Sequence, residues 1–246
     1  MRLEGRTALV TGASSGIGRA TALALAGKGA RVKATGRDEP ALQRLADETG
    51  ADHLVADLAV RAGVERVAGW AGEVDVLVNN AGFGWAGPFP GISPDEIDAL
   101  VRVNLLAPLL LTNLLLPGMQ ERGSGNVVNV ASIAGHVGVR HEAAYAATKA
   151  GLIAFTESLR YELSGSGVTV TLVSPGAIDT AFFEREGRPY DRSFPRMIKP
   201  EAVAAGIVRA IERDRADVFV PRWMAFPARL RGAMPGLYRR LAARFG

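Results

Sequence analysis

The 246-residue chain contains no cysteine and only three histidines. The missing thiols exclude disulfides, thiolate catalysis and cysteine-based zinc sites. The histidines are too widely spaced to form a metal-binding motif, so we expect no metal centre.

Targeting signals are also scarce. The first ten residues, MRLEGRTALV, carry Glu4 and run directly into a strand-like pattern, without the apolar core of a signal peptide. The most apolar run, residues 105–119, is shorter than the roughly 20 residues that span a bilayer, and it contains two prolines and an asparagine. We expect this run to form a buried or interface helix, and the protein to be cytoplasmic.

Acidic residues are absent from the end of the chain. Six of the 29 basic residues, all arginines, follow residue 217, and all 25 acids precede residue 218, which leaves residues 1–217 with a net charge of −2. The composition, 48% hydrophobic and 22% charged, fits one large α/β domain over residues 1–246. The net positive charge therefore comes from the tail, residues 221–246.

Seven short β-rich runs alternate with helical patterns along the chain. Such repetition predicts a Rossmann-like, doubly wound α/β fold, with a parallel sheet of about seven strands and helices on both faces. The predicted strands are 7–12, 30–35, 51–57, 74–80, 126–132, 168–175 and 217–221. Two regions look irregular, 182–200 and the tail, and we expect the first to shape a substrate site at the carboxyl edge of the sheet.

The first predicted strand leads into the glycine-rich segment VTGASSGIGRA. Gly12, Gly16 and Gly18 allow a tight turn and close approach of the backbone to a pyrophosphate, which free N–H groups at a helix start bind well. Taken alone the spacing is weak evidence, because glycines at a strand-to-helix junction often serve only the turn.

Several further motifs occur in a defined order along the chain, and together with the glycine-rich segment they resemble the short-chain dehydrogenase/reductase family. They are TGASSGIG at 11–18, NNAG at 79–82, Asn104, Ser132, YAATK at 145–149 and PGAIDT at 175–180. The resemblance covers almost the whole chain. It implies an NAD(P)(H)-dependent oxidoreductase that interconverts carbonyls and alcohols.

Tyr145 and Lys149 are four residues apart in a helical segment and therefore share one face. A neighbouring ammonium favours the phenolate, so the tyrosine can act as a general acid/base near neutral pH. Ser132 is placed to hydrogen-bond the substrate oxygen. The resemblance implies that Lys149 also binds the nicotinamide ribose and that Asn104 supports a water-linked proton path. Each residue alone also fits an ordinary structural role, as a core tyrosine, a solvated lysine, a turn serine or a capping asparagine.

The resemblance further implies a set of cofactor-binding residues. In this set Ile178 and Thr180 face the nicotinamide, whereas Asn79, Ala81 and Gly82 line the adenosine side. Asp57 meets the adenine amine, although a simple turn at the strand end is an alternative interpretation of this residue. The complete set is Gly12, Ser14, Ser15, Gly16, Ile17, Gly18, Arg37, Asp57, Leu58, Asn79, Ala81, Gly82, Tyr145, Lys149, Pro175, Gly176, Ile178 and Thr180.

The second predicted strand ends in Gly36 and Arg37, where NAD-preferring relatives carry an aspartate. Glycine removes the charge that would repel a 2′-phosphate, and arginine offers a planar cationic fork to bind it. We therefore expect NADP(H) to be preferred and NAD(H) to remain possible, with Ser14 adding a hydroxyl contact. The alternative is a solvated Arg37 neutralised by Asp38 and Glu39.

The substrate is expected to be a small, apolar carbonyl or alcohol compound. Its predicted pocket contains His136, His141, Phe83, Trp85, Phe182, Phe183 and Tyr190, although core packing is the alternative for each aromatic. An idle, cofactor-sensing protein on the same fold is the competing function. We expect a homodimer or homotetramer, paired through the apolar helix and the helix of Tyr145 as in relatives.

The tail has apolar residues at steps of three and four with arginines between them, and Pro227 and Pro235 are expected to divide it into two short helices. A packed helix with a solvated basic face, a flap or subunit contact, and peripheral membrane attachment are all open. Nucleic-acid binding is disfavoured, because no recognition motif accompanies the charge.

Overall fold

A computed structural model describes residues 1–180, 182–185, 190 and 195–245. The described residues contain one parallel seven-stranded sheet, as predicted, and its strand order is β3-β2-β1-β4-β5-β6-β7. The strands are β1 (Thr7–Thr11), β2 (Arg31–Gly36), β3 (Asp52–Val55), β4 (Val76–Asn79), β5 (Gly125–Val130), β6 (Val168–Pro175) and β7 (Asp217–Val220).

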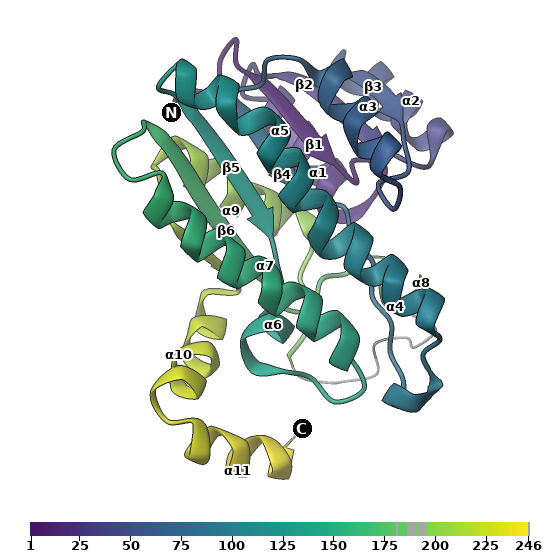
Figure 1. Ribbon diagram of the computed structural model, residues 1–246, viewed down its shortest axis with the longest axis vertical. Helices are drawn as coiled ribbons and strands as arrows, with labels where there is room; N and C mark the ends of the chain where they lie inside the picture. The colour runs from purple at the N-terminus through teal and green to yellow at the C-terminus, as the bar shows by residue number, and fades with distance from the viewer. Residues whose placement is uncertain (181, 186–189, 191–194, 246) are drawn as a thin grey trace.

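Helices cover both faces of this sheet (Figure 1). The α-helices are α1 (Gly16–Ala26), α2 (Glu39–Thr49), α3 (Arg61–Ala71), α4 (Pro94–Val101), α5 (Ala107–Glu121), α6 (Ile133–Val137), α7 (Ala143–Glu162), α8 (Phe182–Arg185), α9 (Pro200–Glu212), α10 (Ala225–Ala233) and α11 (Pro235–Phe245). Short 3-10 helices span Phe89–Gly91 and Arg222–Met224, and a π-helical turn spans Arg102–Leu106.

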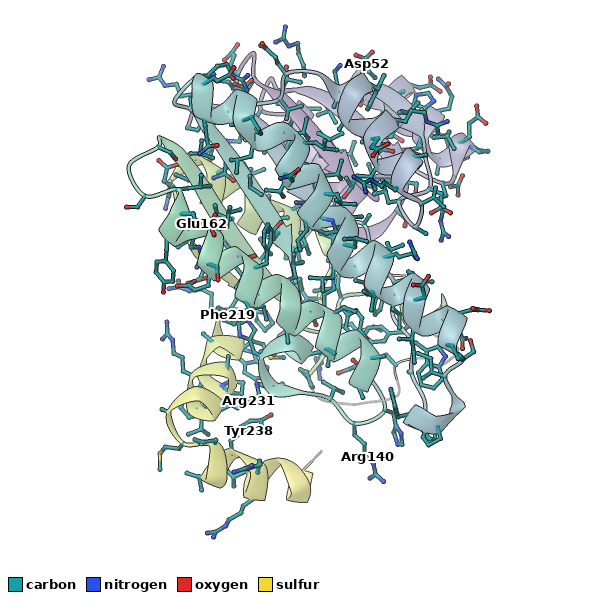
Figure 2. The ribbon with its side chains drawn as sticks, viewed as in Figure 1. Asp52, Arg140, Glu162, Phe219, Arg231 and Tyr238 are labelled. Atoms are coloured by element: carbon teal, nitrogen blue, oxygen red, sulfur yellow. The ribbon has the colours of Figure 1, made fainter. Side chains whose placement is uncertain are left out.

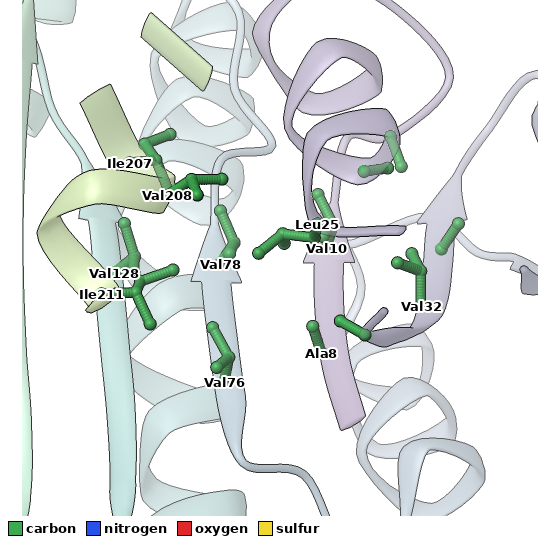
Figure 3. Packing of buried hydrophobic residues seen from close by; sticks show 14 of the residues in the cluster. Ala8, Val10, Leu25, Val32, Val76, Val78, Val128, Ile207, Val208 and Ile211 are labelled. Carbon is green, nitrogen blue, oxygen red and sulfur yellow. The ribbon is translucent and has the colours of Figure 1, made fainter. Parts of the chain in front are cut away.

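Alternation along the central strands separates two apolar layers. In β1, Ala8 and Val10 face the layer formed with α1, α2 and α9, whereas Leu9 faces the layer formed with α3, α5 and α7. Figure 3 shows the first layer, where Val10 lies near Leu25 of α1 and Val128 lies near Ile211 of α9. The two layers hold the strand ends in fixed positions.

The apolar run at 105–119 lies within a continuous helical segment, Pro94–Glu121. By length and composition this segment is apolar enough to cross a membrane, with a mean hydropathy of 1.8 over 18 residues, and 39% of that window is buried in the protein. Leu111 and Met119 are fully buried against the sheet, so core packing accounts for much of its hydrophobicity.

Strand order reverses between β1 and β4, because β2 and β3 lie on one side of β1 while β4 to β7 lie on the other. In open parallel sheets, ligands bind outside the carboxyl ends of the strands at such a reversal. The topology therefore predicts a ligand site among the loops that follow β1, β2, β4, β5 and β6.

Candidate active site

A cavity of about 520 Å³ lies at these carboxyl ends. Every loop named above contributes to it, including Gly12 after β1, Arg37 after β2, Gly82 after β4, Ser132 after β5 and Gly176 after β6. Residues remote in the sequence thus converge on one site. Among the residues that the structure describes, no group of three or more His, Asp or Glu side chains could hold a metal ion.

The glycine-rich turn forms one wall of the cavity. Gly12 and Gly16 have positive φ angles of 66° and 53°, a conformation that favours glycine. A β-carbon on Gly12 would lie 2.9 Å from the α-carbon of Ala81, so the turn leaves no room for a side chain. Ser15 makes no side-chain cap for α1, which leaves the N–H groups at this helix start available to an anion.

Gly18 has a different function from the other two glycines. It does not line the cavity, and a β-carbon there would lie 2.2 Å from the carbonyl oxygen of Gly12. The residue allows α1 to pack closely behind the turn, so its contribution to a cofactor site is indirect.

Gly18→Ala is expected to destabilise the fold by about 1–3 kcal/mol and to weaken NADPH binding, because the turn must move to admit the methyl group. Gly69→Ala is the matched control: Gly69 lies in α3 with open space around its α-carbon, and alanine should stabilise that helix by about 0.5–1 kcal/mol. Urea unfolding and NADPH titration measure both effects. Equal behaviour of the two variants would contradict the packing role.

Arg37 lies at the cavity with its side chain exposed. Within the described part of the chain it makes no ion pair, and Asp38 instead caps α2 by accepting a hydrogen bond from the Ala41 N–H at 2.9 Å. Neither Asp38 nor Glu39, the two residues of the alternative interpretation, forms an ion pair with Arg37 among the described residues. At Gly36 a β-carbon would lie 3.0 Å from the Ser14 hydroxyl oxygen, so a larger residue would crowd the loop.

Asp57 and Leu58 also line the cavity. One carboxylate oxygen of Asp57 accepts a hydrogen bond from the Ala59 N–H at 2.9 Å, which is the turn expected as the alternative to adenine binding. The turn and a ligand contact are compatible, because a carboxylate has two acceptor oxygens.

Asn79 lies elsewhere than predicted. Its side chain is 2% exposed and donates to Asn129 Oδ1 at 2.9 Å and Thr112 Oγ1 at 3.2 Å, inside the core. The neighbouring Asn80 lines the cavity instead and donates to the Thr11 carbonyl at 2.9 Å. The hydroxyl of Thr11 accepts from the N–H groups of Asn80 and Ala81, both at 3.0 Å, and so fixes the loop after β4 against β1.

Tyr145 and Lys149 share one face of α7, as predicted, and both line the cavity. The ammonium of Lys149 lies 5.8 Å from the centroid of the Tyr145 ring and donates to the Val130 carbonyl at 3.0 Å. Lys149 is only 4% exposed, and this burial lowers its pKa to about 8. The α7 face therefore presents a phenol and a buried amine side by side.

Ser132 lies at the start of α6, directly after β5, and lines the same cavity. Its hydroxyl oxygen accepts a hydrogen bond from the Ala134 N–H at 3.1 Å, which caps α6 and fixes the side chain. The hydroxyl hydrogen remains available to donate. The cap and a hydrogen bond donated to a ligand are therefore compatible in this residue.

Asn104 lies in the π-helical turn between α4 and α5 and does not line the cavity. Its amide accepts from the Phe83 N–H at 3.0 Å, donates to the Phe83 carbonyl at 2.8 Å and reaches Thr148 Oγ1 at 3.3 Å. A β-carbon on Gly82 would lie 2.9 Å from Asn104 Oδ1 and 3.4 Å from Lys149 Nζ. Its side chain thus positions the loop that passes over Lys149.

The segment that follows β6 completes the wall opposite α7. Ile178 pairs with Ile198 in an isolated bridge, and a β-carbon on Gly16 would lie 3.1 Å from the Thr180 methyl group. The predicted residues of this segment that line the cavity are Pro175, Gly176, Ile178 and Thr180, and those of the glycine-rich turn are Gly12, Ser14, Ser15, Gly16 and Ile17.

Four of the seven predicted substrate residues line the cavity: Phe83, Phe182, Phe183 and Tyr190. The last three form a chain of rings that starts at Tyr145, with successive centroid separations of 5.6, 5.6 and 5.0 Å. Residues 181, 186–189 and 191–194 of the predicted 182–200 region and its flank lie outside the described residues. The described part of the region thus places three aromatic rings in a row on the cavity wall.

The other three predicted substrate residues do not line the cavity. His136 packs on Phe219, with ring centroids 5.2 Å apart, and its Nε2 lies 2.9 Å from the Ser174 hydroxyl, while burial lowers its pKa. His141 has a φ of 70° and accepts from the Gly87 N–H through its carbonyl, and Trp85 lies against Gly87. Several other residues that line the cavity were not predicted from the sequence, among them Val103, Val139, Arg140, Glu142 and Met224.

Comparisons with known proteins agree with this geometry. A family model described as short chain dehydrogenase matches residues 6–191. The ketoacyl reductase HetN of Nostoc sp. is 38% identical over 227 residues, covering 89% of this chain and 79% of HetN.

Two solved structures share the fold over nearly the whole chain. A short-chain dehydrogenase from Sphingobium yanoikuyae in complex with NADPH has a TM-score of 0.83 at 30% identity, covering 94% of this chain and 95% of that one. A short-chain dehydrogenase/reductase from Burkholderia phymatum in complex with NAD has a TM-score of 0.87 at 26% identity, with 96% of each chain covered. The chain belongs to the short-chain dehydrogenase/reductase family of oxidoreductases.

Proposed function

We propose that the protein is an NADP(H)-dependent oxidoreductase that interconverts an apolar carbonyl compound and its alcohol. The observation that carries the proposal is the convergence of Tyr145, Lys149 and Ser132 on the cavity that also contains the glycine-rich turn and Arg37. The residues fit a dinucleotide, because the turn excludes side chains at Gly12 and presents uncapped N–H groups at the start of α1. When bound, the cofactor supplies or accepts the hydride.

The side chains around the reacting oxygen supply the proton and the orientation. Tyr145 donates a proton to a carbonyl oxygen or accepts one from an alcohol. The nearby ammonium of Lys149 favours the phenolate, and the Ser132 hydroxyl donates to the oxygen on which charge develops. Asn104 is a positioning residue, since its amide holds the backbone of Phe83 beside Lys149.

The aromatic wall supports an apolar substrate. Phe182 lies against Tyr145, and Phe183 and Tyr190 extend the chain of rings away from it. A panel of apolar ketones, supplied with NADPH and followed by nicotinamide absorbance, tests the proposal. Turnover of at least one ketone supports it, and the absence of turnover across ketones and the reverse alcohol panel counts against it.

Arg37→Asp is expected to shift the NADPH/NADH preference toward NADH by about ten- to a hundredfold, because a charge-assisted contact with a 2′-phosphate is worth about 1.5–3 kcal/mol. Arg37 lines the cavity and forms no ion pair with any residue that the structure describes, which supports this role. Arg44→Asp makes the same charge change on α2 at an exposed residue that does not line the cavity, and should leave the preference unchanged. The ratio of kcat/KM for the two cofactors is the measurement, and an unchanged ratio in Arg37→Asp would remove the assignment.

A homodimer or homotetramer is proposed on the basis of the apolar helix surface. Val101, Leu106 and Leu114, on α4, the π-helical turn and α5, are 40–46% exposed although the opposite side of this segment is buried. Sedimentation velocity would show whether the chain associates, and a monomer at micromolar concentration would contradict this part of the proposal.

A further inference from the structure

The tail leaves the body of the molecule after β7. Figure 1 shows α10 and α11 extending beyond the sheet, with α11 at the end of the molecule remote from β1 and β2. The two predicted short helices are present, but only Pro235 separates them, because Pro227 falls in the first turn of α10 where proline is tolerated.

The first part of the tail packs against the rest of the protein. Met224 is 6% exposed, lines the cavity, and its methyl carbon would lie 3.0 Å from a β-carbon on Gly176. Arg231 of α10 donates to the carbonyl of His136 on α6, the helix that Ser132 caps. Figure 2 shows Arg231 and Tyr238 near one another where α10 turns into α11. The tail is therefore anchored beside the cavity through Met224 and Arg231.

Large apolar side chains along the tail are exposed to solvent. The exposed fractions are 46% for Trp223, 70% for Phe226, 52% for Met234, and 41% for both Leu237 and Leu241. In α11, Leu237 and Leu241 are four residues apart on one face, while Arg239 projects from the opposite one. Exposed apolar side chains at this density along residues 223–241 are unusual for a surface that meets only water.

The charge of the same surface is of one sign. Six arginines follow residue 217 and no Asp or Glu does, whereas residues 1–217 are slightly acidic. The arginines Arg222, Arg229, Arg231, Arg239 and Arg240 are exposed. If the tails of two copies of this chain met, positive charge would face positive charge. This repulsion disfavours the tail of a second copy as the partner of this surface. Basic side chains flanking a strip of Trp, Phe and Leu are typical of helices that lie in the headgroup region of a bilayer.

We infer that α10 and α11 form a docking surface for an anionic phospholipid bilayer. The apolar side chains enter the headgroup region, and the arginines meet the lipid phosphates and carboxylates. Because Met224 belongs to both the tail and the cavity wall, docking places the cavity close to the lipid. The inference is independent of the reaction proposed for the cavity.

Co-sedimentation of the full chain with vesicles provides the test. The chain is expected to bind vesicles of phosphatidylcholine with about 30% phosphatidylglycerol, and to bind pure phosphatidylcholine much more weakly. Arg229→Gln/Arg239→Gln/Arg240→Gln should lower the partition coefficient by roughly a hundredfold, since each arginine contributes about fivefold. Phe226→Ser/Leu237→Ser should also lower it at least tenfold.

The control variant, Arg44→Gln/Arg209→Gln/Arg213→Gln, makes the same charge change at exposed residues on α2 and α9 and at the end of α9. It should bind anionic vesicles like the wild type. Circular dichroism and NADPH binding establish that each variant is folded. Equal loss in the control variant would overturn the inference, because the effect would then follow net charge alone.

Two further outcomes would also overturn it. Tail variants that shift the sedimentation coefficient without lipid would show that the surface joins subunits. Binding of the wild-type chain to duplex DNA in the same buffer, without binding to anionic vesicles, would assign the arginines to nucleic acid.

Discussion

Replacing Tyr145 with Phe is expected to lower kcat by roughly a hundred- to ten-thousandfold, the contribution typical of a positioned general acid/base. Phe preserves the ring that packs against Phe182 and removes only the hydroxyl. The expected effect is therefore confined to the proton transfer, with little change in the affinity for NADPH or in the free energy of unfolding. Steady-state kinetics with the best ketone of the panel, together with NADPH titration, measure both quantities.

Tyr161→Phe is the matched control on the same helix. Tyr161 is 72% exposed, and its hydroxyl donates to Glu157 on the surface at 2.8 Å. Its loss should leave kcat within about twofold of the wild type. A Tyr145→Phe variant with wild-type kcat would refute the assigned chemistry, whatever the behaviour of the control.

Replacing Lys149 with Met is expected to lower kcat/KM by at least a hundredfold. The substitution removes the cation that favours the phenolate of Tyr145 and, in the proposed function, a contact to the nicotinamide ribose. Lys33→Met is the matched control: the Lys33 ammonium also donates to a carbonyl, that of Trp70 at 3.1 Å, and lies 5.1 Å from the Trp70 ring centroid, but it does not line the cavity. Its kcat/KM should stay near that of the wild type.

Lys149→Met is also expected to change how the free energy of unfolding depends on pH. Burial lowers the pKa of Lys149 to about 8, whereas a lysine in the unfolded chain titrates near 10.4. Between these values the unfolded chain binds more protons than the folded one, so the free energy of unfolding contributed by this group rises with pH. The difference corresponds to about 3 kcal/mol over the window.

Urea unfolding of the wild type and of Lys149→Met at about pH 7 and about pH 10 measures this term. The wild type is expected to gain about 2.5 kcal/mol relative to the variant across that range, because pH 10 still lies slightly below the pKa of an unfolded lysine, while all other titrations cancel in the comparison. Parallel pH dependence of the two proteins would show that Lys149 is not held in a desolvated site.

The sequence was sufficient to predict the layered architecture, because strand runs and helical periods reflect burial on both faces of the sheet. All seven predicted strands are present, and the predicted order of motifs places Gly12, Ser132 and Tyr145 around one cavity. Parallel strands connected by helices must bring their carboxyl ends to one edge, so residues at strand ends meet there irrespective of their distance in the chain.

Side-chain direction at the strand ends was less predictable. Asn79 is still in register with Asn129 of β5 and points into the core, whereas Asn80, one residue later, reaches the cavity. A single step along a strand reverses the face. His136 was misplaced for a related reason, since it follows Ser132 by one helical turn of α6 but packs toward Phe219 and Ser174.

The turn at Arg102–Leu106 had no recognisable signal in the sequence. A π-helical turn requires a shift of hydrogen bonds by one residue, which composition does not encode, and here the side chain of Asn104 joins the Phe83 backbone. Met224 and Arg140 lie in segments whose approach to the cavity depends on tertiary packing. These positions were therefore accessible only from the structure.

Isotope transfer tests the central proposal, hydride exchange at this cavity with proton transfer by Tyr145, most directly. The chain is incubated with the best ketone of the panel and NADPH that carries two deuterium atoms on the reactive carbon of the nicotinamide, and the alcohol is analysed by mass spectrometry. We predict one deuterium on the carbinol carbon with the wild type and, over the same time, at least a hundredfold less labelled alcohol with Tyr145→Phe. Unlabelled alcohol from the wild type, or equal labelling by the two proteins, would contradict the proposal.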